Sequence, residues 1–235
     1  MELIFREDAY AVSCTATVTA VDERGIRLDR TVFYPNGGGQ PGDTGLLRFD
    51  GATLRIVDTV KGDGPDDVVH VPEPGAPLPA PGTPVEAEID WDRRHRHMRM
   101  HTALHLVCAV LPGASITGAQ VGAERSRVDF NVPTEGLDKE AIAAALNRLV
   151  AADTPVGSLW ITDEELDANP DLIRTLTVKP PRGHGRVRLV DIAGVDRQPC
   201  GGTHVKRLGE IGGLDVVKIE NKGKQNRRVI VALRD

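Results

Sequence analysis

Apolar and polar residues alternate in short runs through the first 92 residues of the chain. The runs are SCTATVTAVD (13–22), GIRLDRTVFY (25–34), GLLRFD (45–50), TLRIVDTV (53–60), DVVHV (67–71) and VEAEIDW (85–91), and Gly, Pro and Asp residues separate them. Alternation with a period of two is typical of half-buried β-strands. Many short strands at this spacing predict a small antiparallel β-barrel.

The pattern changes after the last of these runs. Helical periodicity predicts helices at about 93–111 and 137–153, and strands are predicted near 116–131, at 156–162 and over RVRLVDI, GLDVVKIE and RRVIVAL. The proline-rich stretch 72–84 resembles a linker, but a strand follows it, so we place the domain boundary near Asp92. The prediction is an α+β protein with a barrel domain at 1–92 and an α+β domain at 93–235.

The first predicted helix carries paired histidines beside an apolar stripe. Leu104, Val107, Cys108 and Leu111 follow the spacing of a buried helix face. In the segment HTALH, a separation of four residues leaves His101 and His105 only about 40° apart around the helix axis, so both can bind one ion. His97 and His101 share this spacing, so a second choice of pair stays open.

A second candidate pair of ligands lies nearly a hundred residues later, in QPCGGTHV. Cys200 and His204 together with His101 and His105 would form a tetrahedral set of three nitrogens and one sulfur, which suits zinc. Gly201 and Gly202 would allow the intervening loop to curl. The alternative is a free cysteine in a glycine-rich turn beside a surface histidine. Cys108 is a rival ligand, although its place in the apolar stripe favours a core thiol.

Composition limits the class of protein. The chain is 40% hydrophobic and 27% charged, and it has no apolar run near 18 residues, which predicts a globular protein that does not span a membrane. Charged residues at positions 2, 6, 7 and 8 interrupt any secretory signal, so we expect a cytoplasmic protein. Three widely spaced cysteines do not form a disulfide framework.

Charge is distributed unevenly along the chain. Residues 1–92 carry 17 acidic and 7 basic residues, whereas residues 93–235 carry 17 acidic and 22 basic residues. The second part could therefore face a polyanion, although a solvated surface gives the same count. The basic residues form three clusters: Arg93, Arg94, Arg96 and Arg99; Lys179, Arg182, Arg186 and Arg188; and Lys218, Lys222, Lys224, Arg227 and Arg228.

Together, HTALH and PCGGTH resemble the editing domain shared by alanyl- and threonyl-tRNA synthetases and by the free-standing AlaX proteins. The motif FYPNGGGQPGDTG (33–45) is similar to the glycine-rich motif of the AlaX and alanyl-synthetase branch. The segments RSRVDFN (125–131) and ENKGKQNRRV (220–229) also fit, so the resemblance to a medium-length AlaX protein covers nearly the whole chain.

This resemblance implies trans-editing, the hydrolysis of the ester that joins a wrong amino acid, serine or also glycine, to the alanine tRNA. A pocket built for alanine discriminates against these amino acids by only about 1 to 3 kcal/mol, so a second site must remove the error. The expected cofactor is one zinc ion per chain, held by His101, His105, Cys200 and His204. The expected partner is mischarged alanine tRNA; the oligomeric state stays open.

The glutamate of an HExxH zinc protease is missing, because threonine follows His101. An ester has a better leaving group than a peptide, so zinc could activate a water molecule for attack by lowering its pKa toward ~7. Four protein ligands, however, are typical of a closed structural site. The ion could expand to five-coordinate, one ligand could be loose, or zinc could only shape the pocket.

Other site residues are predicted by placement. We expect Thr102 to contact the serine hydroxyl, or alternatively to bond back to the carbonyl four residues earlier. Gln120 is a second candidate catalytic residue, and Asp129 could line the pocket beside it. For substrate binding we expect Arg186, Lys222 and Lys224 to contact phosphates, and Gly37, Gly38, Gly39 and Gln40 to reach the editing pocket or only to form a tight turn.

A different class of function stays open. The chain could be a non-catalytic, zinc-stabilised module that binds tRNA. A general esterase or protease would need a nucleophile motif such as G-x-S-x-G or the HExxH glutamate, and the sequence has neither.

Overall fold

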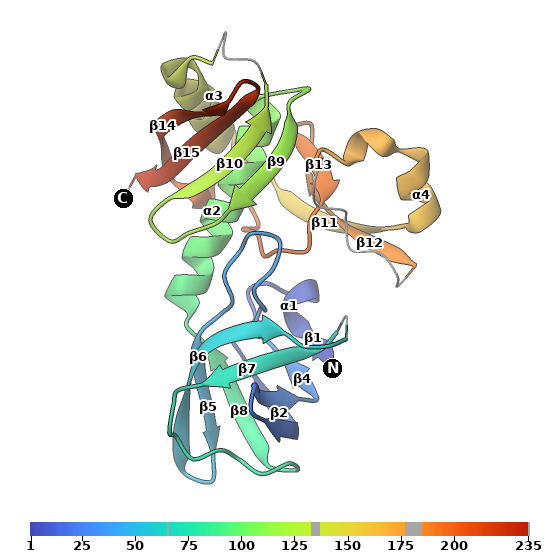
Figure 1. Cartoon of the computed structure of the whole chain (residues 1–235), viewed down its shortest axis with the longest axis vertical. Helices are drawn as coiled ribbons and strands as arrows, with labels where there is room; N and C mark the ends of the chain where they lie inside the picture. The colour runs from blue at the N-terminus through green and yellow to red at the C-terminus, as the bar shows by residue number, and fades with distance from the viewer. Residues whose placement is uncertain (65, 133–136, 177–184, 235) are drawn as a thin grey trace. The chain divides into compact units, whose positions relative to one another are not determined.

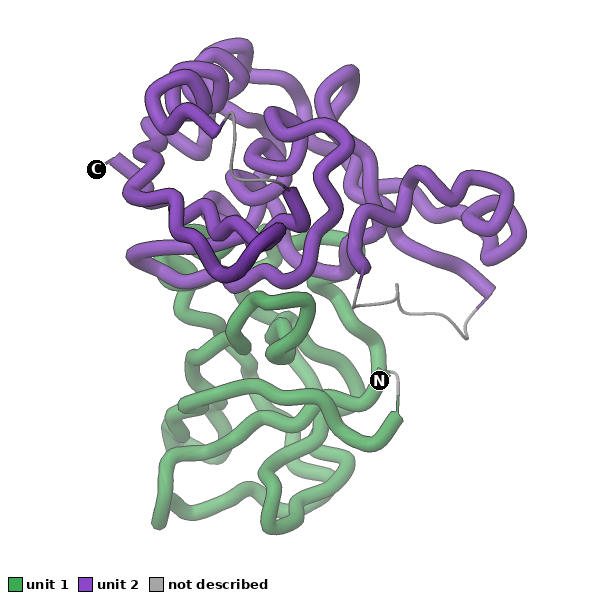
Figure 2. Tube along the Cα trace, turned by 45° about the horizontal axis from the view of Figure 1, so that its top comes forward, with its two compact units in different colours: residues 1–97 green, residues 98–235 purple. Residues whose placement is uncertain are grey.

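The computed structural model describes residues 1–64, 66–132, 137–176 and 185–234. It divides into two compact units, unit 1 (Met1–His97) and unit 2 (Met98–Asp235), coloured separately in Figure 2. The long helix α2 (Trp91–Val110) begins in unit 1 and ends in unit 2. The units divide within this helix, five residues after the boundary predicted near Asp92, and that boundary stays a prediction.

Unit 1 is built on a closed antiparallel barrel with the strand order β2-β3-β7-β6-β5-β8, as predicted (Figure 1). Its elements are β1 (Glu2–Leu3), α1 (Ile4–Glu7), β2 (Ser13–Asp22), β3 (Gly25–Leu28), β4 (Arg30–Thr31), β5 (Gly45–Phe49), β6 (Ala52–Lys61), β7 (Val68–Pro72) and β8 (Pro84–Ile89). Alternate residues of each strand point inward; on β6, for example, Leu54 and Ile56 are buried in the barrel core. The sequence pattern did not reveal β1 and α1.

The glycine-rich motif forms a tight turn followed by close backbone contacts. Gly38 and Gly39 have φ angles of 58° and 81°, and Gly37 and Gln40 exchange two backbone hydrogen bonds of 3.0 and 2.9 Å. Two consecutive positive φ angles are typical of a type I′ hairpin turn. A Cβ atom on Gly42 would lie 2.1 Å from the carbonyl oxygen of Thr59. The predicted tight turn is confirmed.

A buried ion pair fixes the other end of this motif to α2. Arg94 is fully buried, and its guanidinium binds the carboxylate of Asp43, with an Nε to Oδ2 distance of 3.0 Å. It also donates to the carbonyl oxygens of Ala9 (2.8 Å) and Val32 (2.6 Å). The interpretation of Arg94 as part of a polyanion-facing cluster is wrong, because this side chain has no exposed surface.

His70 lies on β7 with both ring nitrogens in hydrogen bonds. Its Nε2 lies 2.8 Å from Thr31 Oγ1 and its Nδ1 lies 2.9 Å from the carbonyl oxygen of Ile26. Burial lowers the pKa of His70 from 6.5 to about 4, and the bond to Ile26 only partly opposes this shift. The folded protein therefore holds His70 neutral at pH 5, where an unfolded chain would protonate it.

The free energy of unfolding of unit 1 should therefore fall as the pH drops from the unfolded pKa to the folded one. The loss attributable to His70 is at most about 3 kcal/mol for a shift of this size. In the His70→Gln variant this contribution should disappear. Urea unfolding at pH 7 and pH 4.5 measures it, with Trp160→Phe in the background so that Trp91 fluorescence reports on unit 1. If the free energy of unfolding fell equally between pH 7 and pH 4.5 in the wild type and in His70→Gln, His70 would not be the source of the loss.

Unit 2 combines two antiparallel sheets with α2, as the α+β prediction requires. A four-stranded sheet has the order β14-β15-β10-β9 and a three-stranded sheet has the order β11-β12-β13 (Figure 1). The strands are β9 (Ser115–Gln120), β10 (Ser126–Asn131), β11 (Val156–Thr162), β12 (Arg186–Ile192), β13 (Asp196–Pro199), β14 (Gly213–Gly223) and β15 (Asn226–Arg234). The sequence pattern did not predict the short strand β13, which leads directly into the CGGTH segment.

Unit 2 has two further α-helices and two 3-10 helices among its described residues, and the α-helices pack on the two sheets. The helices are α3 (Lys139–Ala152), α4 (Asp163–Ala168) and the 3-10 helices η1 (Pro170–Leu172) and η2 (Leu208–Ile211). Thr162 caps α4 through a capping box with Glu165, and Leu166 of α4 packs on Val187 and Leu189 of β12. One face of the three-stranded sheet is thus occupied by α4. None of the described helices combines the length and apolar character that a bilayer crossing requires.

Candidate metal centre

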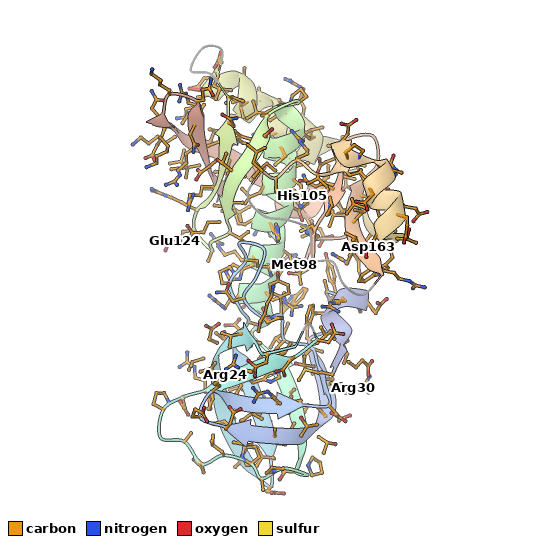
Figure 3. All side chains as sticks on the ribbon, turned by 45° about the vertical axis from the view of Figure 1, so that its right-hand side comes forward. Arg24, Arg30, Met98, His105, Glu124 and Asp163 are labelled. Carbon is orange, nitrogen blue, oxygen red and sulfur yellow. The ribbon has the colours of Figure 1, made fainter. Side chains whose placement is uncertain are left out.

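The part of α2 in unit 2 carries two of the four candidate ligands. His101 and His105 are 6% and 5% exposed, and their ring centroids lie 5.7 Å apart. Leu104 and Val107 are buried with them. Figure 3 labels His105 on this helix, together with Met98, where unit 2 begins.

The second pair of candidate ligands, Cys200 and His204, follows β13 in a loop that forms hydrogen bonds with Arg188. The backbone amide of Cys200 donates to the carbonyl oxygen of Arg188 (3.1 Å). In return, Nη1 of Arg188 donates to the carbonyl oxygens of Cys200 (3.0 Å) and Gly202 (3.1 Å). Gly201 and Gly202 both lack a positive φ. The hydrogen bonds of Arg188 therefore hold the loop in its conformation, and the loop does not use the positive φ angles that Gly201 and Gly202 would allow.

All four predicted ligand side chains meet at one point. The ligand atoms of His101, His105, Cys200 and His204 lie within 4.8 Å of one another. The Cys200 sulfur is 3.5 Å from Nε2 of His101 and 3.3 Å from Nε2 of His204. Tetrahedral zinc with Zn–N near 2.0 Å and Zn–S near 2.3 Å would separate such ligand atoms by about 3.3 to 3.8 Å. The two sulfur–nitrogen distances lie within this range, and the donor set suits a metal ion of this kind.

The competing candidates lie outside this cluster. Within the part of the chain that the structure describes, neither His97 nor Cys108 joins the group of four. Cys108 is buried, and burial raises the pKa of its thiol to about 12. It is a core thiol, as the apolar stripe favours.

The pKa shifts of Cys200 and His204 favour metal binding. Burial raises the pKa of the Cys200 thiol, but His101 and His204 outweigh this effect and bring the pKa well below its usual range. Burial lowers the pKa of His204 to about 3. A thiolate and a neutral imidazole are the forms that bind metal ions.

Thr102 fixes the orientation of His204. Its hydroxyl donates to the carbonyl oxygen of Met98 (2.9 Å) and accepts from the backbone amide of Val205 (3.3 Å). Nδ1 of His204 lies 3.2 Å from the same oxygen, so this nitrogen donates the proton and Nε2 faces the other ligands. The predicted back-bond to the helix is confirmed. A contact between Thr102 and the substrate serine stays a prediction.

Asp196 on β13 fixes the orientation of His105, as Thr102 does for His204. One carboxylate oxygen lies 2.8 Å from Nδ1 of His105 and accepts from Nε2 of Gln198 (2.7 Å). The other oxygen is 3.7 Å from Nη1 of Arg174. Burial lowers the pKa of His105, but the bonds to Asp196 and Cys200 outweigh burial and raise the pKa to about 9. A metal ion must displace this proton from His105.

The Asp196→Asn variant should bind zinc about 10- to 100-fold more weakly, because a neutral amide polarises His105 less than a carboxylate does. Competition with a chromophoric chelator measures the affinity. Asp191→Asn is the matched control, since this neighbouring carboxylate pairs with Arg197 instead. Equal affinities for the Asp196→Asn variant and the control would contradict the role of Asp196.

Other residues predicted by placement have partners away from the four ligands. Gln120 is exposed at the end of β9, where it accepts a hydrogen bond from Nε of Arg127 (3.1 Å). Asp129 binds Arg127 (2.5 Å) and Arg228 (2.7 Å). A catalytic role for Gln120 stays a prediction.

The basic residues differ in their exposure, and therefore in whether they can contact a phosphate. Arg186, Lys222 and Lys224 are exposed, and Lys222 lies 3.1 Å from Glu220. Arg227, by contrast, is buried and donates to carbonyl oxygens of the β14–β15 turn. It therefore has a structural role, which corrects its place in the predicted cluster. Lys179 and Arg182 lie outside the described residues.

Sequence reasoning missed Asp196 and the bracing role of Arg188. A signal for Asp196 was present in the sequence, because this acidic residue lies four positions before Cys200. A segment so near a candidate ligand must lie close to the candidate metal centre. Metal-binding histidines commonly donate their second N–H to a carboxylate, so a search for such an acid could have found it.

Comparison with known proteins agrees with this geometry. Residues 187–230 match the family described as the threonyl and alanyl tRNA synthetase second additional domain. Residues 8–93 match the family of class II (A) tRNA synthetases. The chain thus matches synthetase-related families both across the barrel and around Cys200 and His204.

Several relatives cover nearly the whole chain or all of it. An alanyl-tRNA editing protein AlaX-M of Methanosarcina mazei is 41% identical, covering 100% of this chain and 97% of its own length. AlaX-M of Saccharolobus solfataricus is 34% identical, with 97% of each chain covered. An alanine–tRNA ligase of Pyrobaculum neutrophilum is 38% identical over 92% of this chain but 25% of its own length. The chain therefore belongs to the AlaX family of alanyl-tRNA editing proteins.

Proposed function

We propose that this protein is a trans-editing hydrolase that releases serine, and also glycine, from mischarged alanine tRNA. The observation that carries the proposal is the convergence of three imidazoles and one thiolate in unit 2 of a chain whose full-length relatives are alanyl-tRNA editing proteins. The site of the reaction is the cytoplasm, where tRNAs are charged.

The metal of the centre is zinc, one ion per chain. Its ligands are His101, His105, Cys200 and His204, because three nitrogens and one sulfur at tetrahedral spacing suit this borderline-soft ion. When bound, zinc supplies a Lewis acid at the place where the ester carbonyl is attacked by water.

The residues of the chain orient and admit the substrate. Cys200 is partly exposed, whereas the three histidines are buried, so the aminoacyl ester approaches the centre from the cysteine side. Thr102 and Asp196 hold His204 and His105 by their Nδ1 atoms, which leaves both Nε2 atoms aimed at the centre. Thr102 and Gln120 are the candidates for contacts with the amino acid.

Phosphates of the tRNA bind to exposed basic residues of unit 2. Arg186, Lys222 and Lys224 are the candidates, and such contacts make binding strongly dependent on salt. In unit 1, the amide groups of Gly37, Gly38, Gly39 and Gln40 are the candidates for selecting the mischarged end.

The test is a deacylation assay on alanine tRNA charged with serine, glycine or alanine. The protein should release serine and leave alanine attached, a chelator should abolish release, and zinc should restore it. Tight binding of tRNA without release would instead show the alternative function, a zinc-stabilised binding module. Release from all three substrates alike would contradict editing.

A further inference from the structure

We infer that Trp160 is a stacking platform for the terminal adenine base of the tRNA. This inference rests on the proposed function, because it assigns a binding place to the nucleoside that carries the ester. It starts from the pairing of β11, β12 and β13.

The register of the sheet places Trp160 in one cross-strand row with a metal ligand. Trp160 on β11 pairs with Arg188 on β12. Arg188 in turn lies opposite Cys200, whose backbone amide donates to the Arg188 carbonyl oxygen (3.1 Å). Residues opposite each other on antiparallel strands point to the same face of a sheet. Trp160, Arg188 and Cys200 therefore line one face, which we call the Trp160 row.

This face carries the metal centre and is free of α4. Asp196 and Gln198, which hold His105, pair with Ile192 and Val190 of β12 and share the face with Arg188. The alternate residues, Val187 and Leu189, point the other way and pack on α4. The Trp160 row thus runs away from the metal centre on the side of the sheet where the substrate must lie.

The length of the row suits the substrate. Neighbouring strands are about 4.8 Å apart, so two steps separate Trp160 from Cys200 by about 10 Å of backbone. In an aminoacyl adenosine the ribose lies between the ester and the base, a span comparable with two strand spacings. With the ester at the metal centre, the adenine reaches the level of Trp160.

The exposure and charge around Trp160 suit a nucleotide. Trp160 is 42% exposed, although indole is a side chain that proteins usually bury. The other tryptophan, Trp91, already stacks on His95 with a 5.2 Å separation of ring centroids. Arg186, exposed at the start of β12, is a diagonal neighbour of Trp160 on the same face and can bind the phosphate next to the terminal nucleoside.

The test uses the zinc-loaded full chain and a non-hydrolysable probe, 3′-serylamino-3′-deoxyadenosine. Trp160→Leu, which keeps an apolar side chain but no ring, should raise the Kd of the probe about tenfold to a hundredfold, the usual cost of losing one base–aromatic stack. Trp160→Phe should restore most of the affinity. Serinamide, which has no base, should bind the wild type, Trp160→Leu and Trp160→Phe with equal Kd. The control variant is Leu78→Ala, which changes an exposed apolar residue of unit 1.

Fluorescence provides an independent measurement. In the Trp91→Phe background Trp160 is the sole tryptophan, and the probe should quench its emission whereas serinamide should not. Unquenched emission, or an unchanged Kd for Trp160→Leu with full zinc content, would overturn the platform. If the wild type still releases serine in that case, the proposed function stands; if the wild type neither releases serine nor binds the probe, both fail. Should Trp160→Leu not fold, the quenching experiment decides.

Discussion

Replacing Cys200 by alanine should remove zinc from the purified protein and abolish release of serine. Cys200 supplies the one anionic donor of the four, and two neighbouring imidazoles stabilise its thiolate. Loss of a residue that only orients a metal-binding side chain costs about 10- to 100-fold in metal affinity, so loss of Cys200 itself should cost more than about a hundredfold. Metal analysis of the purified variant and the deacylation assay measure the two effects.

The other two cysteines provide matched controls for this variant. Cys14 lies in unit 1, and Cys108 is a buried thiol of α2 outside the group of four. Cys14→Ala and Cys108→Ala should therefore retain one zinc ion per chain. Full zinc content in Cys200→Ala, or zinc loss in Cys108→Ala alone, would contradict the ligand assignment.

Replacing Arg94 by methionine should destabilise unit 1 severely. The substitution leaves the buried carboxylate of Asp43 without its cation and two carbonyl oxygens without a donor. Breaking a buried ion pair by removing one partner costs about 3 to 5 kcal/mol. Urea unfolding followed by Trp91 fluorescence, in the Trp160→Phe background, measures the change.

Two further variants test the cause of this loss. Arg94→Met with Asp43→Leu should recover part of the stability, because no unpaired charge stays buried. Arg48→Met, which removes a surface partner of Glu88, should change the free energy of unfolding far less than Arg94→Met does. A loss for Arg94→Met as small as that for Arg48→Met would show that the buried pair does not stabilise the unit.

The elements that sequence reasoning found are those with a strong periodic signal. Strands such as β2 and β6 alternate over ten residues each, and the stripe around Leu104 marks α2. Short elements lack this signal. The four residues DRQP of β13 contain two charges and a proline, and only their pairing with β12 makes them a strand.

The convergence of the four candidate ligands was predictable, but the residues around them were not. His101, His105, Cys200 and His204 follow from residue type and spacing. The partners Thr102 and Asp196 depend on which side chains meet after folding. Arg94 illustrates the same limit, because a charge count cannot distinguish a guanidinium on the surface from one that is buried against a carboxylate.

The central claim is that His101, His105, Cys200 and His204 together hold one zinc ion. X-ray absorption at the zinc edge of the purified protein tests it most directly. The spectrum should show three nitrogen neighbours at about 2.0 to 2.1 Å and one sulfur at about 2.3 Å, and the sulfur should vanish in any zinc retained by Cys200→Ala. A wild-type spectrum without sulfur, or with oxygen neighbours alone, would contradict the assignment.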